Sequence, residues 1–480
     1  MRGAIQPDAN IKTGAAFAPI AAKMQAQGLP DVAVRIFENY YGQLRAGATG
    51  FIAGTEAGAV KAVPDYATLP AENVTESVAA RRGVLDRTVV LKLNGGLGTS
   101  MGMTGPKSLL PLKDNLTFLD IILRQMEHLR ATTGARLPLV LMNSFSTQAA
   151  TQAVLDARNW EQDIPATFLQ HMLPKIRVDT LEPVTWPDDP QKEWCPPGHG
   201  DIYAALSSSG VLQAMHAQGY EYLFVSNSDN LGAILDERIL GHMARTGAPF
   251  LMEVAARTAA DRKGGHLAQN PQGGLLLREL SQCPPDELDQ FQDIARYGYF
   301  NTNNLWIHLP ALQALLDANQ GLLPLPLICN EKPVDPTQPA SPRVYQLETA
   351  MGAAIARFDG AQALCVPRTR FAPVKKNSDL LVLWSDAYRL SPDYRLTLVN
   401  GCAAPPLANL DDRFYQQIAD LQQRFPHGAP SLARCRSLTI EGDIYFGREI
   451  VVEGDVLLQN PNEQPVHIPD GTHLTPTSAI

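Results

Sequence analysis

The segment from Lys92 to Ser108, KLNGGLGTSMGMTGPKS, decides the fold of this chain. It overlaps an apolar run, TVVLKL at residues 88–93, which is typical of a buried β-strand. Glycines after such a strand allow positive φ angles and let backbone N–H groups approach a polyphosphate closely. The loop contains Gly95, Gly96, Gly98, Gly102 and Gly105. The segment therefore predicts a strand, a phosphate-binding loop and a lysine, Lys107, at the end of the loop.

The spacing within this loop excludes two common nucleotide-binding motifs. Counted from Gly96, the glycines are spaced GxGxxxG, which differs from the GxGxxG fingerprint of dinucleotide-binding folds. Pro106 directly precedes Lys107, where a Walker A loop has a glycine. The loop is therefore of another class.

Two further apolar runs resemble the first, because each ends in small polar residues. The run at 137–142 stops at Asn-Ser, and the run at 222–225 stops at Ser-Asn-Ser-Asp-Asn. Between the loop and the second run, residues 118–129 have the apolar spacing of an amphipathic helix. Strands separated by helices predict an α/β fold with βαβ units and a mostly parallel sheet. Ligands of such sheets bind at the carboxyl ends of the strands, where these polar clusters lie.

The two ends of the chain have other patterns. Residues 1–85 are rich in alanine, and the apolar spacing from Val32 to Leu44 predicts an amphipathic helix. Near the C-terminus, IEGDI at 440–444 recurs twelve residues later as VEGDV at 452–456. Such a repeat favours the rungs of a small β-solenoid, although a hairpin or meander would also fit.

Composition limits the classes of function. A chain of 480 residues with 45% hydrophobic and 19% charged residues is a globular protein of several domains. Its net charge of -9 argues against a bulk electrostatic grip on nucleic acid or an anionic membrane. Six scattered cysteines without a CxxC pair argue against a disulfide framework or a structural zinc site. With no signal-peptide pattern and no apolar stretch of membrane-spanning length, we expect a cytoplasmic enzyme.

The loop LNGGLGTSMGMTGPKS at 93–108 resembles the nucleotide-binding loop of the eukaryotic-type UTP–glucose-1-phosphate uridylyltransferases, or UDP-glucose pyrophosphorylases. Further blocks resemble that family in the same order: LMNSFST at 141–147, WCPPGHGDIY at 194–203, FVSNSDNLGA at 224–233, LMEVAARTAADRKGG at 251–265, FNTNNLW at 300–306, and QLETAMGAAI and VPRTRFAPVKKNSDLL within 346–381. The blocks cover roughly residues 88–390, whereas the first 85 residues match only loosely.

The resemblance implies a Rossmann-like nucleotidyltransferase fold (GT-A-like), with a mixed sheet flanked by helices and a C-terminal β-helix. The expected domains are a helical N-terminal segment (1–85), a catalytic α/β domain (86–390), and a linker with a β-helix domain (391–480).

The resemblance also implies the reaction of UTP with glucose 1-phosphate, which gives UDP-glucose and pyrophosphate. A phosphate oxygen of the sugar phosphate attacks the α-phosphorus of UTP in line, so the site needs cations and positioning groups rather than an activated nucleophile. Lys107 resembles the family lysine that contacts the triphosphate. Lys375, in RFAPVKK, resembles the catalytic lysine at the α-phosphate, and its alignment favours it over Lys376.

Further roles follow from the same resemblance. Asp229 is expected to bind Mg²⁺, the one cofactor implied, since a carboxylate after a strand suits a metal that also binds phosphate oxygens. Gln170 is expected to contact the edge of uracil. The implied nucleotide-binding residues are Leu93, Asn94, Gly95, Gly96, Lys107, Gln170, Gly198, Asp229 and Lys375. The implied sugar-phosphate-binding residues are His199, Asn227, Gly265, Asn303 and Glu348.

The sequence is also compatible with two alternative functions. UDP-N-acetylhexosamine and broad-specificity UDP-sugar pyrophosphorylases share the loop, but theirs tends to carry arginine after GT or GE, whereas Thr99-Ser100-Met101 stands here. A non-catalytic scaffold that binds nucleotide sugars is a more remote alternative. The expected partners are UTP and glucose 1-phosphate, with no nucleic acid or membrane. The C-terminal β-helix is expected either to mediate self-association or to pack on a neighbouring domain, with the stoichiometry and any regulation left open.

Overall fold

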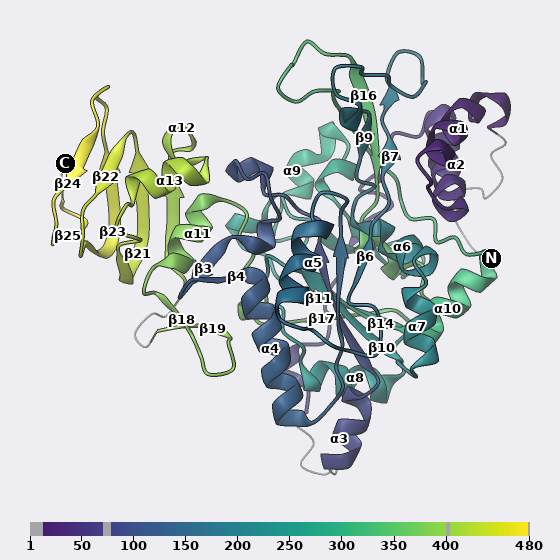
Figure 1. Cartoon of the computed structure of the whole chain (residues 1–480), viewed down its shortest axis with the longest axis horizontal. Coiled ribbons are helices and arrows are strands. Elements are labelled where there is room, and N and C mark those ends of the chain that lie inside the picture. The colour runs from purple at the N-terminus through teal and green to yellow at the C-terminus, as the bar shows by residue number, and fades with distance from the viewer. Residues whose placement is uncertain (1–12, 71–77, 400–403, 479–480) are drawn as a thin grey trace.

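The computed structural model describes residues 13–70, 78–399 and 404–478. Three parts follow one another along the long axis of the molecule (Figure 1). A large sheet with helices on its faces lies in the middle, the C-terminal strands lie at one end, and the first two helices lie at the other. The middle part and its junction with the C-terminal strands contain most of the residues singled out in the sequence.

The large sheet is mixed. Strands β10 (Tyr222–Asn227), β2 (Thr88–Asn94), β5 (Leu139–Asn143) and β6 (Thr167–Leu169) run parallel in this order. Strand β14 (Tyr299–His308) pairs antiparallel with β10 and with β11 (Phe250–Ala256). The mixed sheet implied by the family resemblance is therefore confirmed, whereas a mostly parallel sheet is wrong around β14. The apolar pattern of a strand does not encode its direction, which explains the error.

The three strands expected from the apolar runs are confirmed, as β2, β5 and β10. Because alternate side chains of a strand point to opposite faces, each face of the sheet has its own core. Val89 and Leu91 pack in one hydrophobic cluster and Val90 in the other. Helix α4 (Phe118–Thr133) covers the face of Val90, as its predicted apolar spacing requires, and α10 (Leu309–Ala318) belongs to the opposite cluster.

The remaining elements complete this body. The other helices here are α3 (Val78–Leu85), α5 (Gln148–Ala157), α6 (Ile202–Ser208), α7 (Val211–Ala217), α8 (Glu237–Thr246), α9 (Leu288–Phe291) and α11 (Asn377–Trp384). The other strands of the large sheet are β1 (Gly58–Ala59), β12 (His266–Gln269), β13 (Leu275–Arg278) and β17 (Gln362–Cys365). Shorter sheets contain β3 (Pro111–Lys113), β4 (Leu116–Thr117), β7 (Leu173–Pro174), β8 (Ile176–Arg177), β9 (Trp194–Cys195), β15 (Ile328–Pro333), β16 (Arg343–Glu348), β18 (Tyr388–Leu390) and β19 (Leu396–Leu398).

The N-terminal part contains the predicted amphipathic helix. It is α2 (Asp31–Arg45), and it packs with α1 (Ala18–Ala26). Phe37 and Tyr41 of α2 belong to a cluster that includes Leu173 and Cys195 of the β7–β9 pair. Strand β1, further along the same segment, pairs with β12 of the large sheet. The N-terminal residues therefore contact the α/β body at two places.

The C-terminal part is built from parallel strands. Strands β20 (Leu407–Leu410), β21 (Ser431–Glu441), β23 (Val451–Gln459) and β25 (His473–Leu474) form one sheet, and β22 (Ile444–Phe446) pairs with β24 (Val466–Ile468). The repeat seen in the sequence does not set their alignment, because Ile440 pairs with Leu458 and not with Val452. Gly442 lies after the end of β21, while Gly454 lies inside β23. The two copies of the motif thus occupy different structural positions.

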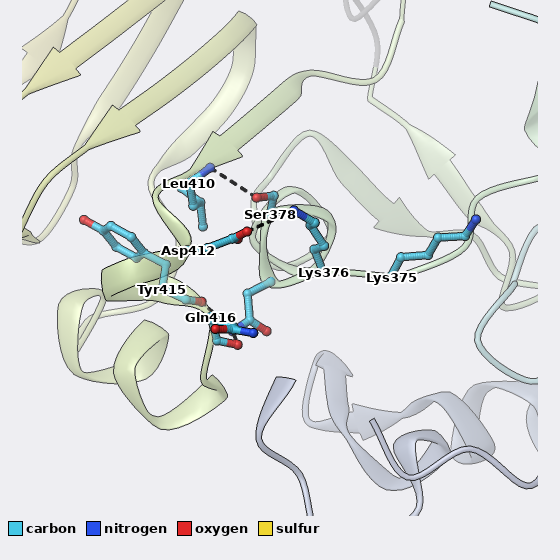
Figure 2. Close-up of a pocket in the computed structure, with 8 residues that line it drawn as sticks. Lys375, Lys376, Ser378, Leu410, Asp412, Tyr415 and Gln416 are labelled. Atoms are coloured by element: carbon cyan, nitrogen blue, oxygen red, sulfur yellow. Dashed lines mark hydrogen bonds and ion pairs between the residues drawn. The ribbon is translucent and has the colours of Figure 1, made fainter. Parts of the chain in front are cut away.

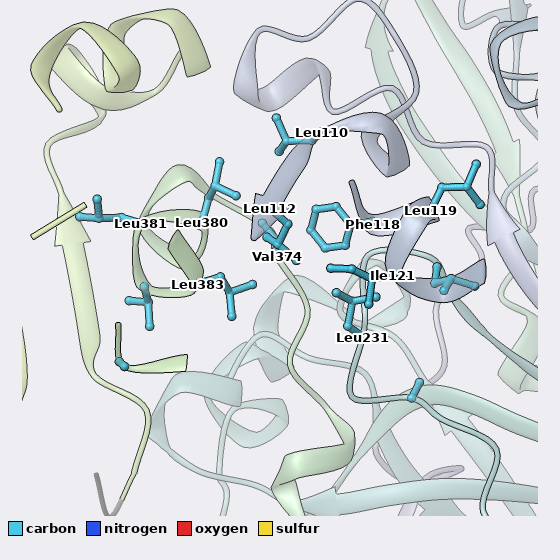
Figure 3. Close-up of a cluster of buried hydrophobic side chains, with 14 of the residues drawn as sticks. Leu110, Leu112, Phe118, Leu119, Ile121, Leu231, Val374, Leu380, Leu381 and Leu383 are labelled. Carbon is cyan, nitrogen blue, oxygen red and sulfur yellow. The ribbon is translucent and has the colours of Figure 1, made fainter. Parts of the chain in front are cut away.

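A shared hydrophobic cluster joins the C-terminal strands to the α/β body. Figure 3 shows its central part, where Val374 lies beside Leu112 and Phe118, and the leucines of α11 extend toward the C-terminal strands. Leu410 and Leu438 belong to the same cluster. Two short helices, α12 (Asp412–Tyr415) and α13 (Ile418–Arg424), lie between β20 and β21. The segment that carries Lys375 is therefore anchored in the junction of the two parts.

Two expectations concern the whole chain. Within the ranges that the structure describes, no helix has both the length and the apolarity needed to span a bilayer. No disulfide joins the five described cysteines, and Cys402 lies outside the described residues.

Candidate active site

The two ends of the glycine-rich loop are joined by backbone hydrogen bonds. The backbone N–H of Lys107 donates to the carbonyl of Gly96 over 2.9 Å, and that of Met103 donates to Gly98 over 3.3 Å. Of the five glycines, Gly98 and Gly102 adopt the positive φ angles that the sequence predicts, at 64° and 74°. The side chain of Gln417, from the C-terminal part, packs directly on Gly102. The loop thus delivers Lys107 next to the end of β2.

Three segments that are distant in the sequence meet at Lys107. Its Nζ donates to Oδ2 of Asp229 over 2.7 Å and also to the carbonyl of Val374. The backbone N–H of Val374 donates in turn to the carbonyl of Asp229 over 3.2 Å. The Lys107 and Asp229 side chains are only 14% and 21% exposed. The structure therefore brings together two of the predicted charged residues and the direct neighbour of the third, Lys375.

Lys375 and Lys376 point in different directions. Both lysines line a pocket with Asp412 and Tyr415, but in Figure 2 the side chain of Lys375 extends away from the other lining residues. Lys376 pairs with Asp412 at 3.3 Å. The backbone N–H groups of both lysines donate to one carboxylate oxygen of Asp379, over 2.7 and 2.9 Å. Asp379 therefore holds the backbone at the point where the two side chains diverge, and Lys375 is directed toward the α/β body.

The carboxyl ends of β2, β5 and β6 form the next part of the site. Asn94 is buried, and its Nδ2 donates to Oδ1 of Asn143 over 2.7 Å and to Oγ1 of Thr151 over 2.9 Å. Leu93, before it, is half-buried. The side-chain amide of Gln170 lies against Gly95, where a Cβ would be 3.2 Å from its Nε2. Gln170 and Gly95 are thus in contact, while the Asn94 donors are used within the protein.

A second loop approaches the end of β16. Gly198 has φ 76° and ψ 170°, and a Cβ there would lie 2.5 Å from the carbonyl oxygen of Thr349. Only glycine fits this backbone conformation without strain. The backbone N–H of Met351 donates to Nδ1 of His199 over 2.9 Å, so the ring proton is on Nε2. Burial lowers the pKa of His199 to about 4, so the ring is neutral at physiological pH. Glu348 ends β16, directly before Thr349.

The remaining predicted residues lie at the ends of β10 and around β14. Asn227 ends β10, and its Oδ1 is buried without a partner among the described residues. Oδ1 of Asn303 accepts from Nδ2 of Asn301 over 2.8 Å, and Asn303 has φ 59°. The N–H of Asn301 donates to the carbonyl of Gly265 over 2.9 Å. Gly265 and Asn303 are therefore linked through Asn301.

One acidic residue beside this group was not expected from the sequence. A Cβ on Gly265 would overlap the carboxylate of Glu279, which follows β13 directly. Burial raises the pKa of Glu279 to about 7, and the charge of Lys375 acts in the opposite direction. Glu279 thus lies near both the predicted sugar-binding glycine and Lys375. Its signal in the sequence is an apolar run, LLLRE, that ends in an acid, but this run lies outside the blocks that resemble the family.

Hydrogen bonds among buried polar residues hold the segments that carry the site. Arg370 donates to both carboxylate oxygens of Glu253, over 2.7 and 2.6 Å. Asn230 holds the chain before Lys375 on both sides, since its Nδ2 donates to the Arg370 carbonyl over 3.1 Å and its Oδ1 accepts from the N–H of Ala372 over 2.9 Å. Lys92 is buried and donates to Ser226 Oγ and the carbonyl of Ala233. A charged residue inside an apolar strand is the sequence signal for Lys92 and for Glu253.

The site therefore has two ends. Lys107, Asp229 and Val374, the residue before Lys375, meet at one end, and Gly198, His199 and Glu348 at the other. Among the described residues, no hydrogen bond or ion pair joins His199 or Glu348 directly to the Lys107–Asp229 pair. The same described part of the chain contains no group of three or more His, Cys, Asp or Glu side chains arranged around a metal position. Asp229 is thus a single carboxylate and not part of an all-protein metal cage.

Comparisons with known proteins show which family the sequence matches. The family model of UTP–glucose-1-phosphate uridylyltransferase matches residues 40–453. The enzyme of that name from Saccharomyces cerevisiae is 41% identical over 391 residues, covering 81% of this chain and 77% of the relative. The one from Hordeum vulgare is 38% identical over 471 residues, covering 96% and 98%.

Solved structures give the same result for the fold. UDP-glucose pyrophosphorylase from Leishmania major, solved in open and closed forms, has a TM-score of 0.90 at 44% identity over 97% of this chain and 99% of that one. A UDP-glucose phosphorylase from Trypanosoma brucei has a TM-score of 0.88 at 43% identity, with the same coverage. A variant of the Leishmania major enzyme, solved in complex with UDP-glucose, also has a TM-score of 0.90. The chain described here belongs to the family of UTP–glucose-1-phosphate uridylyltransferases.

Proposed function

We propose that this protein transfers UMP from UTP to glucose 1-phosphate, forming UDP-glucose and pyrophosphate. The observation that carries the proposal is the meeting of Lys107, Asp229 and the Lys375 segment at the carboxyl end of the sheet. A lysine paired with one carboxylate, next to the segment that carries a second lysine, suits a reaction between two phosphate-bearing substrates. Membership of the uridylyltransferase family supports the same reaction.

The charges of the residues suggest a separate role for each of them in the reaction. The phosphates of UTP would compete with Asp229 for Lys107, which would then stabilise the leaving pyrophosphate. Lys375 would stabilise charge on the α-phosphate as an oxygen of glucose 1-phosphate attacks in line. The Nε2–H of neutral His199 is available as a donor to the sugar phosphate. This division explains how a chain of net charge -9 binds anions, through a few placed cations and donors.

The base and the hexose would be bound at neutral groups. Among the described residues no hydrogen bond satisfies the Gln170 amide, which can donate to and accept from uracil. The Gly198 backbone and the residues from Leu93 to Gly96 would complete the nucleotide pocket. Asn227, Gly265, Asn303 and Glu348 would surround the hexose. Glu279, beside Gly265, joins this second group in our proposal.

Mg²⁺ is the proposed cofactor, and the donor set fits it. Mg²⁺ in phosphoryl-transfer sites is usually held by one or two carboxylates together with substrate phosphates and water. Asp229 is a single carboxylate, 21% exposed, beside the lysine proposed for the triphosphate. When bound, the ion would neutralise charge on the phosphate oxygens. Chelation with EDTA should therefore abolish turnover, and excess Mg²⁺ should restore it.

The direct test is release of pyrophosphate from UTP and glucose 1-phosphate, with UDP-glucose identified by chromatography. Absence of UDP-glucose at saturating substrates and Mg²⁺ would reject the proposal. The reverse reaction should be compared with UDP-glucose, UDP-galactose and UDP-N-acetylglucosamine. A preference for the acetylated sugar would instead favour the alternative of a UDP-N-acetylhexosamine pyrophosphorylase.

We also propose that the parallel C-terminal strands form a β-helix through which copies of the chain associate. Leu407 of β20 and Leu457 of β23 are 69% and 50% exposed on this part. Deleting it would expose the shared core, so substitution is the better test. Mass measurement in solution should give an oligomer for the wild type and a smaller species for a variant with Leu407→Asp and Leu457→Asp. A monomeric wild type would contradict this. The cytoplasmic location expected from the sequence stays a prediction.

A further inference from the structure

A buried carboxylate connects the two loops that carry Gln170 and His199. Asp201 ends the 3₁₀ turn His199–Asp201, and both it and His171 are only 7% exposed. Oδ2 of Asp201 accepts from the backbone N–H of His171 over 2.7 Å. Oδ1 lies 2.8 Å from Nδ1 of the same histidine. Both carboxylate oxygens of Asp201 therefore contact the same residue, His171.

The position of this contact matters because of the neighbours on each side. His171 directly follows Gln170, whose own N–H donates to the carbonyl of Asn143 over 2.8 Å. The peptide that carries Gln170 is therefore held on one side by β5 and on the other by Asp201. His199 stands two residues before Asp201 in the same turn. One carboxylate consequently links the backbone at Gln170 to the backbone at His199.

Besides the Asp201 contacts, other hydrogen bonds also join these two loops. The backbone N–H of Lys175 donates to the carbonyl of Glu193 over 2.8 Å, and Sγ of Cys195 donates to the carbonyl of Leu173 over 3.5 Å. The loops also pair through β7 and β9, in which Leu173 lies opposite Cys195. This ladder has two residues in each strand, and so short a pair is weak by itself. A buried charge-assisted hydrogen bond to the backbone is stronger and more directional than such a ladder. Loss of the carboxylate should therefore let the two loops shift relative to each other.

We propose that Asp201 is a positioning residue that fixes Gln170 relative to His199 and so sets the discrimination of uracil from cytosine. The inference rests on the proposed function, which places the base at Gln170 and the sugar phosphate at His199. Gln170 can distinguish the two bases only if its amide is held at a fixed distance and orientation. Asp201 is buried with both oxygens on His171, so it would act through the peptide backbone and not by contact with a substrate.

The hydrogen-bonded chain continues to Ser208, and this offers a control. Nε2 of His171 lies 2.9 Å from Oγ of Ser208, an exposed residue at the end of α6. The order Ser208, His171, Asp201 has the connectivity of a nucleophilic triad. Nearby backbone donors that could stabilise an oxyanion are already used, since Ser209 donates to Ala205 and Gly210 to Ser207. Ser208→Ala should therefore leave catalysis and base selectivity unchanged.

The experiment compares the full chain with Asp201→Asn, His171→Gln and Ser208→Ala, with UTP and CTP as alternative substrates. Asp201→Asn keeps the shape but loses the charge, so we expect the ratio of kcat/KM for UTP to that for CTP to fall about tenfold, since small displacements of a recognition group have effects of this order. The change should come from KM for UTP, with kcat altered less than about threefold. His171→Gln keeps the backbone N–H that Asp201 binds, so it should lose less selectivity.

The outcomes separate this inference from the proposed function. A folded Asp201→Asn variant with wild-type selectivity and KM would overturn the positioning role. So would a uniform loss of kcat with unchanged selectivity, or a loss of selectivity in Ser208→Ala as large as in Asp201→Asn. If Asp201→Asn does not fold, a loss of selectivity in His171→Gln supports the role, and its absence overturns it. If the wild type forms no UDP-glucose, the proposed function fails by itself, and calorimetric binding of UTP and CTP to the same variants still tests Asp201.

Discussion

The two ends of the candidate site are built on different principles. At the Lys107–Asp229 end, opposite charges join segments that are far apart in the sequence, and the carboxylate is partly exposed. At the Gly198–His199 end, the backbones are so close that a single Cβ would not fit, and the imidazole is held neutral by burial. The first end can exchange its ion pair for contacts with phosphate. The second is preformed, and its selectivity depends on steric fit.

The largest effect is expected at the charged end. Lys375→Ala should lower kcat about 10²- to 10³-fold, because it removes a preorganised cation from the α-phosphate. Steady-state assay of pyrophosphate release measures this loss. Lys376→Ala is the matched control, since Lys376 is 67% exposed and pairs with Asp412 instead. Equal losses in the two variants would show that the charged end does not depend on the direction of Lys375.

A steric change at the preformed end should act on stability as well as on binding. Gly198→Ala introduces a Cβ 2.5 Å from a backbone oxygen, in a conformation that is essentially restricted to glycine. We expect it to lower the free energy of unfolding by about 1–3 kcal/mol from backbone strain alone. It should also raise KM for UTP. Denaturant unfolding and steady-state kinetics measure the two effects.

Gly210 provides the matched control for this strain. Its φ of 78° is similar to that of Gly198, but a Cβ there would meet nothing within 4 Å. Gly210→Ala should cost about 1 kcal/mol, the ordinary penalty of a left-handed residue. If both variants lost the same stability and both kept wild-type KM, close packing at Gly198 would not contribute to the site.

These two ends also show what could be predicted from the sequence. Strands β2, β5 and β10 were found because an apolar run of the right length is a local property. Strand β14 was not predicted as a strand, and its antiparallel direction depends on pairing partners far away in the chain. The IEGDI repeat does not give the strand register in the C-terminal part, where Ile440 pairs with Leu458.

Some site residues could likewise be predicted from the sequence, and others could not. Lys107, Asp229 and Lys375 stand in blocks that resemble the family, and the structure places the three segments together. Glu279 was missed because its environment comes from the distant residues Gly265 and Lys375. Asp201 was read only as part of a loop motif, and its contact with His171 depends on tertiary structure. The family resemblance predicted which residues belong to the site, but it did not predict the contacts between them.

The neutral state of His199 predicts a pH dependence of stability. Its pKa is lowered by burial from 6.5 to about 4. Below about pH 6.5 the unfolded chain binds a proton at this residue that the folded chain does not bind. His199 therefore lowers the free energy of unfolding as the pH falls toward about 4. The slope is at most about 1.4 kcal/mol per pH unit. His199→Gln should remove that slope in denaturant unfolding between pH 4 and 6.5. The exposed His427, changed to Gln, is the control, and an identical profile for both variants would contradict the assignment.

The smallest effect on activity is expected at Glu279, whose pH dependence of stability has the opposite sign to that of His199. Burial raises its pKa from 4.5 to about 7. As the pH rises from about 4.5 to 7, the unfolded chain releases a proton that the folded chain keeps, so this residue lowers the free energy of unfolding with rising pH. Glu279→Gln should remove this slope, and the wild type should show the two slopes partly cancelling. The glutamine of this variant resembles the protonated, neutral form of Glu279. The variant should therefore lose kcat/KM only above about pH 7, where the wild type has a carboxylate at this position, and by no more than about tenfold. A loss that is equally large at pH 6 and pH 8 would mean that Glu279 acts through its shape and not through its charge.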